Sequence, residues 1–135
     1  MKRNLVCLVV LGMMLLPLGA FAQDLVGEWV ITGTSWGATA GDTDHGVGTG
    51  DRFVSAASGW TLFIEQVEEG AFHGRWCGPN ICEDLVGVVR RDGSLLMADE
   101  DSTFFGTMYG EDLELCVIEP GESLRIAACR MMQRN

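Results

Sequence analysis

Basic residues are scarce in this chain of 135 residues. Lysine and arginine together number 9, against 19 aspartate and glutamate residues, and the formal net charge is −10. Proteins that bind a phosphate backbone need clustered Lys and Arg, so the acidic balance argues against nucleic-acid binding. It is compatible with two alternatives, namely simple solubility of an exported protein or a cationic protein partner.

Histidine is also scarce, which limits the chemistry available for catalysis. His45 and His73 are the two histidines, and no Gly-x-Ser-x-Gly motif is present. Acidic residues are abundant, but most of them fall at predicted turns, and nothing in the sequence marks a carboxyl group buried enough to act as a general acid. We therefore expect a protein that is not an enzyme.

The ligand sets for a metal site are incomplete. Asp42, Asp44 and Asp51 resemble part of a calcium-binding loop, but the later bidentate acid at the required spacing is missing. His45 and His73 have no further ligands at a spacing typical of zinc. We predict no metal and no cofactor.

The first 22 residues, MKRNLVCLVVLGMMLLPLGAFA, have the form of a secretory signal peptide. Two basic residues precede an apolar stretch, and the small-x-small pattern from Ala20 to Ala22 follows it. The apolar stretch is shorter than the roughly 20 residues of a membrane span, although a single anchor is the alternative. We expect cleavage after Ala22, a secreted or periplasmic protein of a bacterium, and no membrane association after cleavage.

The expected mature chain, 23–135, is one domain and contains four cysteines, Cys77, Cys82, Cys116 and Cys129. An even number of cysteines in an exported chain of this size indicates disulfides, and four cysteines allow three pairings. Gly-Pro-Asn-Ile between Cys77 and Cys82 is typical of a four-residue hairpin loop, which favours that pair. The remaining two cysteines would then form a Cys116–Cys129 disulfide. This pair can face each other only if the loop of the last hairpin is longer than a tight turn at Pro120 and Gly121.

No segment of the mature chain has the pattern of a long helix. Apolar and polar residues alternate, and Gly, Pro, Asn and Asp interrupt them about every eight to twelve residues, which is typical of an all-β barrel or sandwich. The expected strands are 25–36, 59–67, 71–77, 82–90, 94–99, 103–109, 112–118 and 124–132. Residues 37–58 are rich in glycine and are expected to form a long loop, a candidate lid.

The links between the later strands are short, which indicates antiparallel neighbours in sequence order. An open meander of eight strands would expose two edges, and closure removes them. We therefore predict an eight-stranded antiparallel up-and-down β-barrel. Alternation along the strands predicts the following inward residues: Trp60, Leu62, Ile64, Phe72, Gly74, Trp76, Leu113, Leu115, Val117, Leu124, Ile126 and Ala128. Strand 82–90 is apolar on both faces, so its orientation is undecided.

The first expected strand begins with a Gly-x-Trp motif, Gly27 to Trp29, and the last carries Arg125 and Arg130. This arrangement resembles the calycin group of small barrels, the lipocalins and especially the avidins. The resemblance implies that Trp29 closes one barrel end against Arg125 or Arg130, and plain core packing of Trp29 is the alternative. The biotin-binding residues of avidins have no aligned counterparts here, so biotin binding is not implied.

The aromatic residues are the main functional lead. The candidate ligand-binding residues are Trp36, Trp60, Trp76, Phe72, Phe104 and Tyr109. An eight-stranded barrel is wide enough to be filled by side chains or to hold one small ligand, and Gly74, Gly87 and Gly106 either relieve curvature or leave space. The leading hypothesis is a small apolar or amphipathic ligand in the barrel mouth. The alternative is a protein-binding module, such as an enzyme inhibitor, that uses the 37–58 loop and the acidic surface. The oligomeric state is not predicted.

Overall fold

The computed structural model describes residues 25–33, 35–41, 52–54, 59–121 and 123–135, and within them it contains ten strands and no helix. The strands are β1 (Gly27–Ile31), β2 (Trp36–Gly41), β3 (Arg52–Val54), β4 (Thr61–Glu68), β5 (Ala71–Cys77), β6 (Cys82–Val89), β7 (Leu95–Ala98), β8 (Thr103–Tyr109), β9 (Asp112–Pro120) and β10 (Leu124–Arg134). No helix in the described part of the chain is long and apolar enough to cross a membrane.

Eight of these strands form a closed antiparallel barrel. Strands β4 to β10 pair in sequence order, and β1 pairs with both β4 and β10, which closes the sheet. In the β1–β10 pairing Trp29 lies opposite Arg134, about a hundred residues away in the sequence. The predicted all-β, eight-stranded up-and-down barrel is confirmed.

The predicted first strand, 25–36, is wrong as a single element, because the chain bends between β1 and β2. Both strands pair with the same edge of β10, with Trp29 opposite Arg134 and Trp36 opposite Cys129. The chain advances seven residues from Trp29 to Trp36, whereas β10 advances only five from Cys129 to Arg134. The connection between β1 and β2 therefore takes up two extra residues, in the manner of a β-bulge. Gly33, with φ at 82°, lies in this bend.

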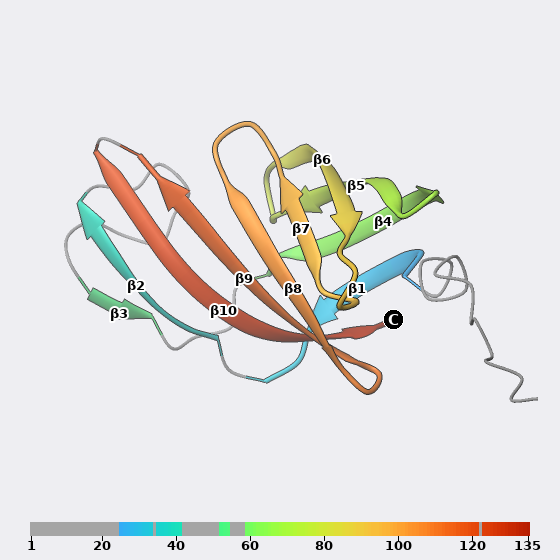
Figure 1. Cartoon of the computed structure of the whole chain (residues 1–135). Coiled ribbons are helices and arrows are strands. Elements are labelled where there is room, and N and C mark those ends of the chain that lie inside the picture. Colours follow the sequence, from blue (N-terminus) through green and yellow to red (C-terminus); the bar gives the residue numbers. More distant parts are fainter. Residues whose placement is uncertain (1–24, 34, 42–51, 55–58, 122) are drawn as a thin grey trace, which may run out of the picture.

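The predicted loop 37–58 is also wrong in part, because it contains most of β2 and all of β3. These strands extend the sheet beyond the barrel along β10, as Figure 1 shows at its left side. A Cβ added at Gly37 would lie 2.5 Å from the backbone oxygen of Ala127. Glycine here allows close contact within a sheet, so its abundance was misleading as a loop signal. Residues 42–51 and 55–58 lie outside the described residues.

The barrel interior is packed with apolar side chains. The predicted inward residues of β9, Leu113, Leu115 and Val117, are buried. In β4 the predicted Leu62 and Ile64 are buried, but alternation is interrupted between Ile64 and Gln66, where the register against β5 shifts. The undecided strand β6 turns Leu85 and Gly87 inward and exposes Val86 and Val88.

The space left by Gly87 is not open. A Cβ added there would lie 2.3 Å from the ring of Phe72, so that ring occupies the space beside the glycine. A Cβ at Gly74 would lie 2.1 Å from the backbone oxygen of Phe63. These glycines serve close packing between neighbouring groups, and the protein's own side chains fill the barrel at this level.

Both predicted disulfides are confirmed. Cys77 lies opposite Cys82 in the β5–β6 hairpin, and Cys116 lies opposite Cys129 in the β9–β10 hairpin. The Cα atoms are 4.0 Å apart in the first pair and 3.9 Å apart in the second. Strand β9 extends to Pro120 and leaves a short link before β10, which brings the second pair into register. Two disulfides are consistent with an extracellular location.

The two bridges are predicted to contribute unequally to stability. They close loops with sequence separations of 5 and 13 residues. In the chain-entropy model the longer loop gives about 3 kcal/mol and the shorter about 2 kcal/mol. Replacing Cys116 and Cys129 by alanine is therefore expected to lower the free energy of unfolding in urea more than replacing Cys77 and Cys82. The reverse order would contradict the loop-entropy explanation.

Candidate functional site at the barrel mouth

Three of the predicted ligand-binding aromatics meet at one end of the barrel, which we call the mouth. At this end β4, β6, β8 and β10 begin and β5, β7 and β9 end. The rings of Trp60 and Trp76 are stacked, with centroids 5.1 Å apart and planes inclined by 13°. Phe104 meets Trp76 edge to face at 5.5 Å. Trp60 is partly buried, whereas the other two rings are buried, so Trp60 is the outermost of the three.

A buried arginine lies against this aromatic group. Arg130 is on β10 opposite Leu115, and its side chain is only 7% exposed. Its guanidinium carbon lies 5.2 Å from the centroid of the Trp76 ring, within the range of a cation–π contact. Burial lowers the pKa of Arg130 to about 10, because removal from water disfavours the charged form. At neutral pH the barrel therefore holds a positive charge among aromatic rings.

A buried hydroxyl accompanies the arginine. Ser35 is 2% exposed, and its Oγ has no hydrogen-bond partner among the described residues. Trp36 lies opposite Cys129, so continuing this register by one residue places Ser35 opposite Arg130. Directly opposed residues of an antiparallel pair share a face, so both belong to the inward face. The buried Ser35 thus adds a second polar side chain to the inward face at this level of the sheet.

The other predicted ligand-binding residues lie elsewhere. Phe72 is buried deeper in the barrel beside Gly87. Trp36 is on the outer face next to the Cys116–Cys129 disulfide and is 45% exposed, and Tyr109 is 58% exposed at the far end of β8. These three residues do not belong to the mouth group.

The arginine that packs against Trp29 is Arg134, and not Arg125 or Arg130 as predicted. The guanidinium carbon of Arg134 lies 5.2 Å from the centroid of the Trp29 ring, and the indole nitrogen of Trp29 donates a hydrogen bond to the Leu25 backbone oxygen at 2.9 Å. Arg125 is exposed on β10, and Arg130 lies over Trp76. The last strand extends to Arg134, so its final arginine reaches the opposite end of the barrel, where Trp29 lies.

Three acidic residues gather near the mouth, and one of them, Glu83, lies opposite Trp76 and so belongs to the inward face of β6. Carboxylate oxygens of Glu83, Asp99 and Asp101 lie within 4.8 Å of one another. Burial is the main factor that raises the pKa of Asp99, although its carboxylate accepts a 2.7 Å hydrogen bond from the Ser102 backbone N–H. Exposed acidic groups commonly gather without a metal, and we assign no site here. The calcium-like segment at Asp42 to Asp51 lies outside the described residues.

The sequence contained an unused signal for the buried arginine. Leu124, Ile126 and Ala128 were predicted to face inward, and the same alternation continues through Arg130 to Met132. An arginine at an inward position of a barrel strand is exceptional and marks a candidate site. Ser35 had no such signal, because its position depends on the bend that precedes β2.

Comparison with protein-family models and with curated proteins identified no related protein. No family model matches the chain, and no curated protein matches it with significance. The closed eight-stranded barrel is compatible with a calycin-like fold, and membership of the avidins or lipocalins remains a prediction.

The two tryptophans Trp76 and Trp36 should respond very differently to truncation. Trp76→Ala removes a buried ring with contacts to Trp60, Phe104 and Arg130, and is expected to cost about 3–5 kcal/mol of unfolding free energy. Trp36→Ala removes a half-exposed ring on the outer face and should cost roughly 1 kcal/mol or less. Urea unfolding followed by circular dichroism measures both values. Similar losses in the two variants would contradict the assignment of Trp76 to the core of the mouth.

Proposed function

We propose that this protein is an exported, non-enzymatic β-barrel that binds a small amphipathic molecule with an anionic group at the barrel mouth. The observation that carries the proposal is the buried Arg130, which lies over Trp76 in the aromatic group of Trp60, Trp76 and Phe104. Ser35 is a second buried polar residue, and extending the register of β2 and β10 places it opposite Arg130. The proposal narrows the predicted ligand, a small apolar or amphipathic molecule, to an anionic amphipathic one.

The energetics of Arg130 support an anionic partner. Removing a guanidinium from water is costly, so an arginine buried among aromatic rings marks a candidate binding site. An anionic group at the same place would form charge-assisted hydrogen bonds with the guanidinium, which are stronger in a dry environment than in water. The Ser35 hydroxyl is available as a further donor to the same group.

The aromatic rings suit the apolar part of such a molecule. Binding sites for small molecules are mostly apolar and aromatic, with a few polar groups that fix the orientation. Buried apolar side chains, from Trp29 to Met132, form one core cluster inside the described barrel, so we place the ligand at the mouth and not deep in the barrel. Trp60, the partly buried ring, is then the wall nearest to solvent.

The same surroundings fit a second hypothesis, in which Arg130 only supports the fold through Trp76. The two hypotheses differ in what happens when the charge is removed. A structural cation–π contact predicts a loss of stability. A charge that serves binding predicts a loss of affinity for an anionic probe, which an exposed arginine replaced in the same way would not show.

The test uses dodecanoate as an anionic probe, with dodecanol as its uncharged counterpart. Dodecanoate is expected to raise the melting temperature and change the tryptophan fluorescence, and dodecanol is expected to do so more weakly. Arg130→Met should weaken dodecanoate binding by about ten- to hundredfold, because a hydrogen bond to a charged group contributes about 1.5–3 kcal/mol. Arg125→Met is the matched control, since Arg125 is an exposed arginine on the same strand.

Three outcomes would count against the proposal. The first is that neither dodecanoate nor other anionic amphiphiles affect the protein. The second is that Arg130→Met and Arg125→Met bind dodecanoate equally. The third is that Arg130→Met lowers the unfolding free energy without ligand by about 2 kcal/mol or more, which would favour the purely structural role.

A further inference from the structure

The outer face of the sheet carries a continuous uncharged surface. Two rows of directly paired residues cross it. One runs from Ala71 on β5 to Trp36 on β2, and the other from His73 on β5 to Phe53 on β3. Apart from His73, every residue in these two rows of described residues is apolar, threonine or a disulfide-bonded cysteine, although 21% of the chain is charged. We call these two rows the uncharged belt.

The large side chains of the uncharged belt are exposed. Six of them are between 39% and 54% exposed, and Phe53 is 92% exposed. The six are Trp36, Val86, Val88, Leu96, Phe105 and Ile118. Together with Phe53 they expose on the order of 600 Å² of apolar surface. This is at the upper end of what the largest patch of a soluble monomer shows, and such patches commonly mark an interface.

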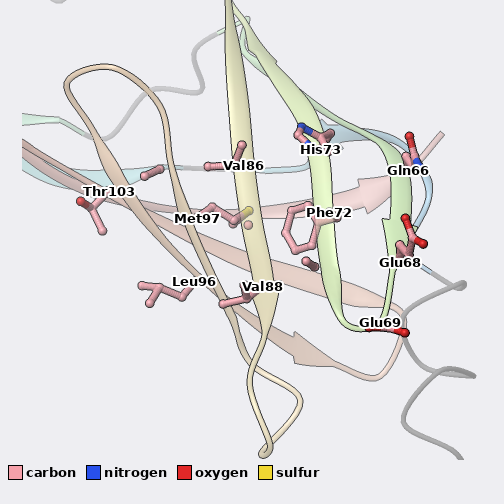
Figure 2. Close-up of a pocket in the computed structure, with 13 residues that line it drawn as sticks. Gln66, Glu68, Glu69, Phe72, His73, Val86, Val88, Leu96, Met97 and Thr103 are labelled. Carbon is pink, nitrogen blue, oxygen red and sulfur yellow. The ribbon is translucent and has the colours of Figure 1, made fainter.

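The belt is hollowed at its β5–β7 end. Val86, Val88 and Leu96 are among the residues that line an open hollow of about 840 Å³, which Glu68 and Glu69 also line. Figure 2 shows these side chains on neighbouring strands around the hollow. The hollow gives a protruding apolar side chain of another molecule a place to pack.

We infer that the uncharged belt is a self-association surface, and that its partner is a second copy of this chain. The area of the belt approaches the roughly 800 Å² per partner of a standard interface once its smaller residues are included. A two-fold interface brings the same patch of both subunits together, so the patch must be compatible with itself. An uncharged belt meets this condition, whereas the acidic surface elsewhere on a chain of net charge −10 would repel its own copy.

A cationic protein partner fits the belt less well. Such a partner would gain most from acidic groups within the contact area, and the two rows contain none. The two partners also predict opposite effects of salt. Added salt screens the repulsion between two acidic copies and strengthens their association, whereas it weakens attraction between an acidic and a cationic protein.

The test measures the mass of the exported protein by sedimentation equilibrium from micromolar to millimolar concentration, at low and high sodium chloride. Mass spectrometry identifies the N-terminus of the sample. The expected result is a dimer whose dissociation constant falls as salt rises. Leu96→Glu and Phe105→Glu should each raise that constant at least about thirtyfold, as expected for a central interface residue that costs 2 kcal/mol or more.

Tyr109→Glu is the matched control. Tyr109 is on the same strand as Phe105, β8, and its side chain points to the same outer face because the two are four residues apart. It is 58% exposed, but it lies outside the belt. It should leave the dissociation constant nearly unchanged. If a glutamate variant fails to fold, as judged by circular dichroism, Phe105→Gln and Tyr109→Gln make the same comparison without adding charge.

The inference is overturned if the protein is a monomer throughout the concentration range. It is also overturned if the dimer tolerates the substitutions at Leu96 and Phe105 as well as the one at Tyr109, or if salt dissociates it. Association found only in chains that retain residues 1–22 would assign the contact to the apolar leader and would equally overturn it.

Discussion

Strand β10 determines the architecture, because it has three strand neighbours. It pairs with β9 along one edge, and along the other edge it pairs first with β2 and then with β1. The β1 pairing closes the barrel and removes the edges that an open sheet would expose. The β2 pairing extends the sheet past the closed part. A single long strand can hold both neighbours only if the chain between β1 and β2 takes up two extra residues relative to β10, as the two registers require.

This connection also contributes to the polar part of the mouth. Extending the register of β2 and β10 by one residue places the buried Ser35 opposite the buried Arg130, on the face where the apolar residues of the other strands gather. A barrel filled only with apolar side chains would avoid the desolvation cost of a guanidinium. Natural proteins depart from a consistent core at sites that serve a function, and this departure occurs beside Trp60 and Trp76. The departure therefore supports the mouth as the candidate site.

The two proposed surfaces use opposite faces of the same strand. Along β10, Ala128 and Arg130 turn toward the interior, and Ala127 and Cys129 belong to the outer rows. Successive residues of a strand point to opposite faces, so a ligand at the mouth and a second copy on the outer belt would not compete for side chains. Their backbone is shared, and the Cys116–Cys129 disulfide joins β9 to β10 within the belt.

The sequence alone determined the features that depend on neighbours along the chain. Alternation and turn residues located the strands from β4 to β10, the inward face of most of them, and the hairpin that pairs Cys77 with Cys82. Only the tertiary structure decided which distant segments meet. The pairing of Trp29 with Arg134, the outward position of Trp36, and the place of β2 and β3 within a glycine-rich stretch all depend on β10. Register between segments separated by about a hundred residues is set by packing and barrel closure, and neither leaves a local pattern in the sequence.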